Sequence, residues 1–526
     1  KHVYDQIDRR QVPRGAKILS TKWVFDLKKN ELGLVVRYKA RLTVRGFEAR
    51  AGLEYTDIFA SVLRMSSLRL VLSLAAGLGL RVHMVDIVQA FLCANLKETI
   101  YVEPPEGAEA DPDTVWRLNK ALYGLKQAPA AWEQEFATAL VHKLKFRRLD
   151  GDHGLYVRGT GANLIILAVY VDDVVIAYAG SEATMKAGFM AELQRVFDIK
   201  DVGPISFCLG VRVQRDEQSG SITLSMPAYI EDLLEKLRLS SISGHKTPMV
   251  PGQVPSADDC PTTAADKEAM KQGIQSNYRS VIGTLMYLAG ACRPDISYAV
   301  NSLARFTTNP GMAHWQALVY LLGYLKETAT EGITYTGVSL QGPRIEAEAR
   351  ARARSMRRGG VPNPSLSSES YLNNLVAYAD ADFASDTVER RSTSGWAVYL
   401  NGGPVSWRSH RQKSVSLSTT EAELYSLSDC LQEVIWLQRV LIELGYPQPT
   451  MRVGPGLSNS GTVIYEDNKG ARDGSKNYGS VAGRSKHMGI RKNFVQWHVN
   501  VGTISVTECS SEEMVADLLT KPVGSV

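Results

Sequence analysis

The stretch "LAVYVDDVVIAY", from Leu167 to Tyr178, places two adjacent aspartates in the middle of the most strand-like segment of the chain. Valine, isoleucine and tyrosine favour a half-buried pleated strand, whereas aspartate is depleted in strands and costly to bury without a partner. A tight turn at Asp172 and Asp173 would accommodate both carboxylates. Together with a third carboxylate nearby, the pair would also hold hard divalent cations. The segment therefore predicts a hairpin with an acidic tip, serving either as a turn or as a metal site.

Length and composition restrict the class of protein. At 526 residues the chain is too long for one hydrophobic core, so several domains are expected. A hydrophobic content of 44% and a charged content of 22% are typical of a globular protein and not of a disordered one. The net charge of +5 permits a polyanionic partner without requiring one. Six cysteines without CxxC spacing predict reduced thiols in an intracellular protein, with no disulfide framework and no zinc site.

No segment of the sequence predicts a membrane anchor or a signal peptide. The most apolar stretch, around residues 68–85, is interrupted by Arg69 and Arg81 and predicts a buried helix that leads into a strand. The polar opening "KHVYDQIDRRQVPRG" lacks the apolar core of a signal peptide. We therefore expect no membrane partner, and the absence of an initial methionine suggests a piece of a polyprotein.

Three kinds of pattern follow one another along the chain. From Lys17 to about Met226, short apolar strands alternate with helical patterns, and a mainly helical stretch follows. Residues 341–369 are rich in arginine, glycine, proline and serine, and we interpret them as an exposed linker or insertion that could also touch nucleic acid. After them, strand, hairpin, helix and strand patterns predict a separate α/β domain with acidic residues of its own.

A first set of carboxylates lies in the amino-terminal part. Asp86 ends the predicted strand "LRVHMVD", and Asp172 and Asp173 follow on the hairpin. An aspartate at a strand end, followed downstream by "YVDD" between apolar strands, is the arrangement of palm-type polymerases. In-line displacement at a phosphate is promoted by two metal ions about 3.5–4 Å apart. Magnesium prefers oxygen ligands and shares them with substrate phosphates, so a few carboxylates suffice.

The sequence resembles the reverse transcriptase–ribonuclease H portion of copia-type LTR retrotransposon polyproteins. The motifs that carry the resemblance cover nearly the whole chain apart from the arginine-rich segment, in the order "KWVFDLK", "RYKARLTVRGF", "VDIVQAFL", "IYVEPPEG", "LYGLKQAPAAW", "YVDDVVI", "FCLGVRV", "YRSVIGTLMYLA", "RPDISYAV", "DADFASD", "RRSTSGW", "SLSTTEAELYSL", "EDNKGA" and "ADLLTKP".

The resemblance implies roles for residues of the first part. Asp86, Asp172 and Asp173 would bind the polymerase metals, with Asp173 the least direct ligand. The resemblance implies that four other residues contact the nucleotide or template: Lys39, Arg41, Phe91 and Gln127. For Phe91, ordinary core packing is the alternative. A ring beneath the incoming sugar could exclude a 2′-hydroxyl by clash, and cations facing the triphosphate would make charge-assisted contacts.

The second set of carboxylates lies in the carboxy-terminal part, where the resemblance implies a ribonuclease H site. Its expected members come from two strands and two helices: Asp380, Glu423, Asp467 and Asp517. Glu421 is the alternative to Glu423, because residues two apart on a helix cannot face the same way. Asp382 shares a strand face with Asp380 and could be mistaken for it. His487 is either a helper or a structural residue.

The resemblance implies a multidomain α/β (α+β) fold: a palm and fingers polymerase fold with a helical connection, followed by a ribonuclease H-like α/β domain. The expected divisions are 15–240 for fingers and palm, 241–340 for a helical thumb or connection region, 341–369 for the basic linker or insertion, and 370–526 for the ribonuclease H-like domain.

The implied function is copying RNA into DNA and degrading RNA in the hybrid, with two Mg²⁺ ions in each site and Mn²⁺ as an alternative ion. The implied partners are an RNA template, a DNA primer, the RNA–DNA hybrid and deoxynucleoside triphosphates, with integrase of the same polyprotein as a further candidate. An active element would place the protein in a cytoplasmic virus-like particle. Departures from the family pattern, at Ala130, Cys93 and Gly489, keep open a second hypothesis: an impaired relic that at most binds nucleic acid.

Overall fold

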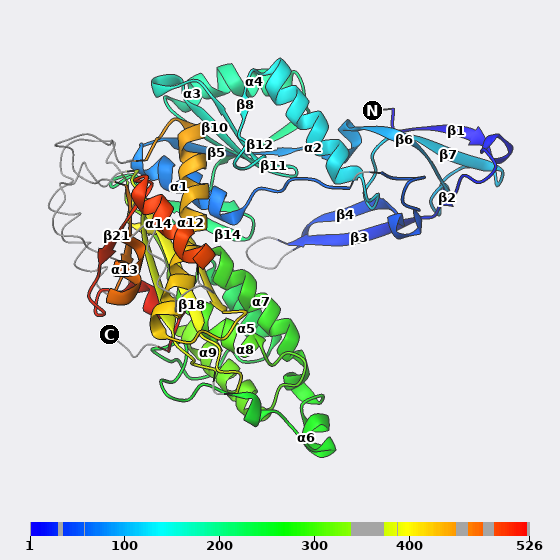
Figure 1. Ribbon diagram of the computed structural model, residues 1–526. Helices are drawn as coiled ribbons and strands as arrows, with labels where there is room; N and C mark the ends of the chain where they lie inside the picture. The colour runs from blue at the N-terminus through cyan, green and yellow to red at the C-terminus, as the bar shows by residue number, and fades with distance from the viewer. Residues whose placement is uncertain are drawn as a thin grey trace. The chain divides into compact units, whose positions relative to one another are not determined.

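The chain forms two compact units in the computed structural model, which describes residues 2–29, 35–56, 58–337, 373–386, 388–448, 461–476 and 489–522 (Figure 1). Unit 1 comprises residues 1–64 and 81–204, and unit 2 comprises residues 65–80 and 205–526. The predicted basic linker at 341–369 and His487 lie outside the described residues. Each unit is described by itself.

Unit 1 contains three β-sheets and a few helices. Its strands are β1 (Tyr4–Asp8), β2 (Ile18–Leu19), β3 (Thr21–Lys29), β4 (Val35–Val44), β5 (Arg81–Ile87), β6 (Asn95–Val102), β7 (Thr114–Lys120), β8 (Arg147–Arg148), β9 (Leu155–Arg158), β10 (Ile165–Tyr170), β11 (Asp173–Tyr178) and β12 (Ile199–Pro204). Its α-helices are α2 (Ala128–Thr138), α3 (Glu182–Met185) and α4 (Ala191–Gln194). The strand orders are β1-β7-β6-β2, β12-β5-β11-β10-β9-β8 and the ribbon β3-β4.

The six-stranded sheet carries the acidic hairpin. Strands β10 and β11 are antiparallel and pair Tyr170 with Asp173, so that only Val171 and Asp172 form the turn. The expectation that both aspartates lie on the turn is wrong for Asp173, which begins β11 and pairs across the sheet with Asp86 on β5. The remaining residues of β11 are buried, because this strand is central and covered on both faces.

Unit 2 includes residues 65–80, although the residues on both sides of this segment belong to unit 1. Its elements as far as residue 337 are α1 (Met65–Gly77), β13 (Phe207–Cys208), β14 (Val211–Arg215), β15 (Ile222–Ser225), α5 (Pro227–Lys236), α6 (Ala264–Ala269), α7 (Tyr278–Ala291), α8 (Ser297–Ala304), α9 (Met312–Glu327) and β16 (Gly332–Tyr335). The hairpin β14–β15 pairs with β16, which explains why residues 205–240 belong to this unit. The helical stretch expected at 241–340 is thus present, closed by one strand.

Helix α1 precedes β5 in sequence but packs on the carboxy-terminal sheet of unit 2. The Arg69 guanidinium donates to the carbonyls of Val405, at 2.8 Å, and Ala291, at 2.9 Å, and it stacks 3.8 Å from the Trp407 ring centroid. Ser73 donates to the Leu400 carbonyl at 3.0 Å. These contacts explain why residues 65–80 group with unit 2 and not with the strands that flank them in sequence.

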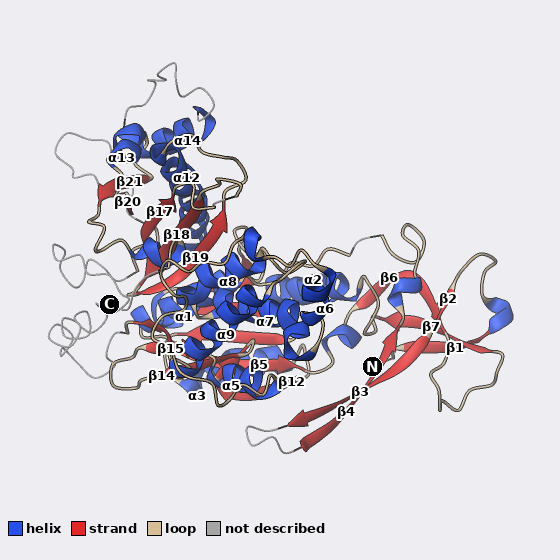
Figure 2. Ribbon diagram, turned by 90° about the horizontal axis from the view of Figure 1, so that it is seen from below, coloured by secondary structure: helices blue, strands red, loops and turns tan. Residues whose placement is uncertain are grey.

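The carboxy-terminal part of unit 2 is a five-stranded sheet with a long helix against it (Figure 2). Its elements are β17 (Val376–Asp382), β18 (Thr393–Leu400), β19 (Gly403–Arg411), α12 (Thr419–Leu444), β20 (Thr462–Glu466), α13 (Lys469–Lys476), α14 (Gly489–Asn500) and β21 (Ile504–Glu508). The strand order is β19-β18-β17-β20-β21, with β20 parallel to β17 and β21. Helix α12 packs on β17 and β18.

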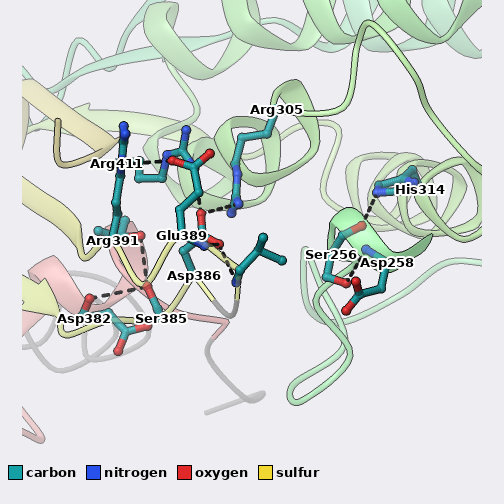
Figure 3. Close-up of polar contacts among 12 residues, drawn as sticks. Ser256, Asp258, Arg305, His314, Asp382, Ser385, Asp386, Glu389, Arg391 and Arg411 are labelled. Atoms are coloured by element: carbon teal, nitrogen blue, oxygen red, sulfur yellow. Dashed lines mark hydrogen bonds and ion pairs between the residues drawn. The ribbon is translucent and has the colours of Figure 1, made fainter. Parts of the chain in front are cut away.

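The loop after β17 is held by a buried carboxylate. Figure 3 shows Arg305 and Arg411 pointing to Asp386, with nitrogen–oxygen distances of 2.5 and 2.6 Å. Backbone amides of Val388 and Glu389 also donate to Asp386, both at 3.1 Å. Through these ion pairs, Asp386 links the end of α8 to β19. The loop is thereby held in place just after β17, the strand that carries Asp380 and Asp382.

The mixed α/β fold predicted from the sequence is confirmed. The apolar stretch around residues 68–85 is a buried helix followed by a strand, as expected. The carboxy-terminal strand, hairpin, helix and strand appear in the predicted order.

Candidate active sites

Asp86, Asp172 and Asp173, here called the hairpin cluster, lie where β5 meets the tip of β10–β11. The backbone amide of Ile87 donates to the Asp172 carbonyl at 2.9 Å, and Asp173 is the cross-strand partner of Asp86. Burial raises the pKa of Asp173 to about 6, and the charges of Asp172 and Asp86 add to the shift. All three side chains are only half-buried. The cluster therefore combines mutual repulsion with access from outside, which suits a site for divalent cations.

The turn that carries the hairpin cluster has an unusual backbone. Val171 has a φ of 57°, a left-handed conformation that is a genuine outlier for a β-branched residue. The indole of Trp132, on α2, donates to the Val171 carbonyl at 2.7 Å. Such strain costs on the order of 1–3 kcal/mol and persists only where the surroundings enforce it. Packing by α2 thus holds the turn, and with it Asp172, in place.

Aromatic and basic side chains flank the hairpin cluster. Phe91, in a short 3-10 helix (Ala90–Cys93), makes an edge contact with Tyr123, with ring centroids 4.9 Å apart. The Arg41 guanidinium lies 6.0 Å from the Tyr123 ring centroid. Burial, followed by the charge of Asp172, raises the pKa of the Tyr123 phenol, while Arg41 opposes the shift. The structure thus brings two of the predicted nucleotide-contacting residues, Phe91 and Arg41, to one aromatic partner beside the aspartates.

The sequence interpretation missed Tyr123, although "LYGLKQ" was among its motifs. Lys39 lies two residues from Arg41 on β4 and therefore on the same face of the ribbon, and it is exposed. Gln127 is buried, and its amide donates to the Glu54 carbonyl at 2.8 Å. It also lines a cavity of about 610 Å³ beside Ala130. A direct contact of Gln127 with nucleotide or template stays a prediction.

Asp380, Glu423, Asp467 and Asp517, here called the sheet cluster, lie beside β17. One carboxylate oxygen from each of Asp380, Glu423 and Asp467 lies within 4.8 Å of the other two. Asp380 comes from β17, Glu423 from α12, and Asp467 directly follows β20. Because β20 is parallel to β17, their carboxyl ends meet at one edge, which brings Asp467 to Asp380.

The structure separates the two candidate glutamates of α12. Glu421 accepts a hydrogen bond from the Leu417 amide at 2.7 Å, and the Ser418 hydroxyl accepts one from the Glu421 amide at 3.2 Å. The Glu421 side chain is therefore occupied by the backbone that precedes the helix, whereas Glu423 faces the other carboxylates. Asp382 lies at the end of β17, where burial raises the pKa of its carboxyl. A metal-binding role for Glu423 stays a prediction, now with geometry that favours it over Glu421.

Asp517 completes the sheet cluster from the 3-10 helix Val515–Leu519. The buried Thr520 hydroxyl donates to Oδ2 of Asp380, and Lys521 Nζ lies 2.8 Å from Oδ1 of Asp517. Burial raises the pKa of Asp517, although Lys521 opposes the shift. Thr520 and Lys521 were quoted within "ADLLTKP" but given no role from the sequence.

Glu466, one residue before Asp467, was also missed. Its side chain is fully buried, and burial raises its pKa far above the usual range. Burial and the nearby charge of Glu466 likewise raise the pKa of Glu423. Within the described residues, one oxygen of Glu423 and one of Glu466 are buried without a hydrogen-bond donor. Several oxygens in a desolvated space with unsatisfied lone pairs fit a divalent cation.

Comparison with known proteins gives the family. The family model described as "Reverse transcriptase (RNA-dependent DNA polymerase)" matches residues 2–251. The Pol polyprotein of transposon TNT 1-94 from Nicotiana tabacum is 36% identical over 98% of this chain and 35% of its own length. That of transposon RE2 from Arabidopsis thaliana is 33% identical over 100% of this chain and 32% of its own length. The chain thus spans about a third of the length of these curated relatives.

Two further comparisons differ in coverage. The putative transposon Ty5-1 protein of Saccharomyces cerevisiae is 30% identical over 66% of this chain and 100% of its own length. A solved structure, the foamy viral protease–reverse transcriptase in complex with double-stranded DNA, is 10% identical, covers 96% of this chain and 67% of that chain, and has a TM-score of 0.45.

In the described part of the chain, no helix has the length and apolar character needed to cross a membrane. By these relatives, the chain belongs to the copia-type retrotransposon Pol polyproteins, and the reverse transcriptase family matches its residues 2–251.

Proposed function

We propose that the chain is an RNA-directed DNA polymerase with a linked ribonuclease H. The observation that carries the proposal is the presence of two carboxylate clusters on two different sheets of one chain. Each cluster fits the oxygen ligands of hard divalent cations, with Mg²⁺ as the physiological candidate and Mn²⁺ as an alternative. Family membership supports the polymerase part of the proposal.

At the hairpin cluster, Asp86 and Asp172 would hold the metal ions and Asp173 would lie behind them. Divalent cations, when bound, would stabilise the attacking primer hydroxyl and the leaving pyrophosphate. Arg41 would place its charge towards the triphosphate of the incoming nucleotide, with Lys39 further along the same face. Phe91 and Tyr123, held edge to face, would form a rigid wall beside the sugar. A wall of this kind selects deoxynucleotides by excluding the additional hydroxyl.

At the sheet cluster, Asp380, Glu423, Asp467 and Asp517 would hold metal ions for hydrolysis of an RNA phosphodiester. The hydrogen bond from Thr520 fixes the orientation of the Asp380 carboxylate. Both activities require a nucleic-acid duplex held through its phosphates, so binding should depend on salt and hardly on sequence. RNA template, DNA primer, RNA–DNA hybrid and deoxynucleoside triphosphates are the proposed substrates and partners, and association with integrase of the same polyprotein is a further proposal.

Two assays on the same preparation test the proposal. Extension of a labelled DNA primer on an RNA template, with Mg²⁺ and deoxynucleotides, reports on the hairpin cluster. Shortening of labelled RNA within a hybrid reports on the sheet cluster. We expect Asp172→Asn to abolish extension and preserve RNA cleavage, and Asp380→Asn to have the opposite effect. The exposed Asp258, in the 3-10 helix Ala257–Asp259 of unit 2, supplies a matched Asp258→Asn control that should retain both activities.

The alternative hypotheses give different results. A folded wild-type chain that binds duplex but shows neither activity would support the relic hypothesis. Cleavage without extension would indicate a ribonuclease whose polymerase site is impaired. Loss of both activities in either single variant, with folding intact, would contradict two independent sites.

A further inference from the structure

The sheet cluster contains a cation of its own. Lys521 Nζ lies 2.8 Å from Oδ1 of Asp517, and the Lys521 side chain is 44% exposed. Burial would lower the pKa of this lysine, but Asp517, Asp380 and Asp467 together raise it. The ammonium group thus lies in direct contact with one of the four members of the cluster.

The backbone around Lys521 is held firmly. The amides of Thr520 and Lys521 both donate to the Asp517 carbonyl, at 3.2 and 3.1 Å. Strand β18 approaches so closely at Gly395 that an added Cβ would lie 2.6 Å from the Thr520 side chain. The hydroxyl of Thr520 is bonded to Asp380. The position of the lysine is thus set by the same short segment that carries Asp517.

An ammonium group and a divalent cation compete for the same carboxylates. Asp517 has to offer this oxygen to one or the other, because an ammonium group 2.8 Å from Oδ1 occupies the space in which a metal ion would bind. A fixed positive charge within a few ångströms also repels a second cation, more strongly where solvent is excluded. In the absence of metal, by contrast, the same charge offsets repulsion among the carboxylates.

We propose that Lys521 is the resident counter-cation of the sheet cluster, which balances Asp517 in the metal-free chain and releases it when a divalent cation binds. The inference rests on the proposed ribonuclease H function, and it assigns Lys521 a positioning role. Lys521 weakens metal binding and, in exchange, keeps the empty cluster assembled. Its removal should therefore shift metal affinity and metal-free stability in opposite directions.

The test measures Mn²⁺ binding directly, by the loss of the free-ion electron paramagnetic resonance signal. All measurements use a background protein that carries Asp86→Asn, Asp172→Asn and Asp173→Asn. These changes remove metal binding at the hairpin cluster, so the signal reports on the sheet cluster. In this background we expect Lys521→Met to tighten Mn²⁺ binding about tenfold, because one repelling charge is lost. The melting temperature in EDTA should fall, and it should return towards the wild-type value at saturating Mn²⁺.

The controls separate the explanations. Lys521→Arg keeps the charge and should bind Mn²⁺ as the background protein does. Lys236→Met removes an exposed lysine that also pairs with an aspartate four residues away, Asp232, and should change nothing. Unchanged Mn²⁺ affinity in Lys521→Met with weaker hybrid binding would overturn the proposal in favour of a phosphate contact. Equal losses of melting temperature with and without Mn²⁺ would overturn it in favour of a structural role.

Failure of the proposed function gives a different signature. If the background protein binds no Mn²⁺, or if adding Asp380→Asn leaves its binding unchanged, the sheet cluster is not the metal site. The proposal for Lys521 then falls together with the ribonuclease assignment. A background protein whose Mn²⁺ binding requires Asp380 preserves the assignment and isolates the effect of the lysine.

Discussion

Arg69 offers the sharpest test of how unit 2 is assembled. This arginine is 4% exposed and lies on α1, where the carbonyls of Val405, Gly290 and Ala291 accept its hydrogen bonds. Gly290 and Ala291 are the last residues of α7, whose carboxyl-terminal end carries partial negative charge. Arg69→Met keeps an unbranched, flexible side chain, although a shorter one, and removes all of these bonds.

The size of the effect follows from two opposing contributions. Burial lowers the pKa of Arg69 to about 10, which corresponds to a desolvation cost of about 3 kcal/mol. Three hydrogen bonds from a charged donor contribute about 1.5–3 kcal/mol each, and stacking on Trp407 adds about 1–2 kcal/mol. The favourable contributions exceed the cost, so we expect Arg69→Met to lower the free energy of unfolding by about 3–8 kcal/mol.

Urea denaturation of the full chain measures the change, and hydrogen exchange of residues 65–77 localises it. Arg279→Met, at an exposed position of α7, is the matched control and should change stability by less than about 0.5 kcal/mol. A stability of Arg69→Met equal to that of the control would refute the reasoning, because it would mean that the bonds only repay the desolvation. Unchanged exchange of residues 65–77 would likewise show that α1 does not depend on this anchor.

Three further perturbations have definite signs. Val171→Gly relieves the left-handed strain and should stabilise the chain by about 1 kcal/mol in thermal melts, unless the turn relaxes differently from the observed backbone. Asp173 has a folded-state pKa near 6, above its unfolded value, so the metal-free chain should lose stability as pH rises from about 4 to 6. Asp173→Asn should reduce this slope, to which Asp380 with a pKa of about 6 also contributes, and should stabilise the metal-free chain at pH 7.5 by about 2 kcal/mol in urea titrations. Asp386 has a lowered pKa because hydrogen bonds from Arg411 and backbone amides outweigh burial, so its contribution is present at neutral pH and lost in acid. Asp386→Ala should cost about 3 kcal/mol at pH 7 and progressively less below pH 4, measured as melting temperature.

Local patterns in the sequence predict the elements well. Alternating and continuous apolar residues predict the strands of the two sheets that carry the clusters. The helical pattern that begins within "STTE" is α12. The same segment contained the answer to one open alternative. Ser418 followed three residues later by Glu421 has the sequence pattern of a capping box, and the Glu421 side chain is indeed occupied at the start of the helix, by the Leu417 amide. This signal would have favoured Glu423 from the sequence alone.

Long-range contacts account for what the sequence did not reveal. Helix α1 is apolar around most of its surface. Its pattern therefore predicts that it is buried, but it does not indicate which part of the protein covers it. Its partner, β19, lies more than 300 residues away in sequence. Lys521 follows Asp517 by four residues, an ordinary spacing for a helical ion pair. Its position beside Asp380 appears only once β17 is in place.

The two clusters differ in burial, and the difference follows from how their ligands are supplied. The hairpin cluster takes all three carboxylates from one edge of adjoining strands, so its side chains stay half-buried. The sheet cluster draws on β17, α12, the end of β20 and a 3-10 helix, and two of its members, Asp380 and Glu423, are buried, whereas Asp467 and Asp517 are half-buried. Enclosure raises the cost of like charges. At the sheet cluster, the role we propose for Lys521 is to offset this cost at Asp517 when no metal ion is bound.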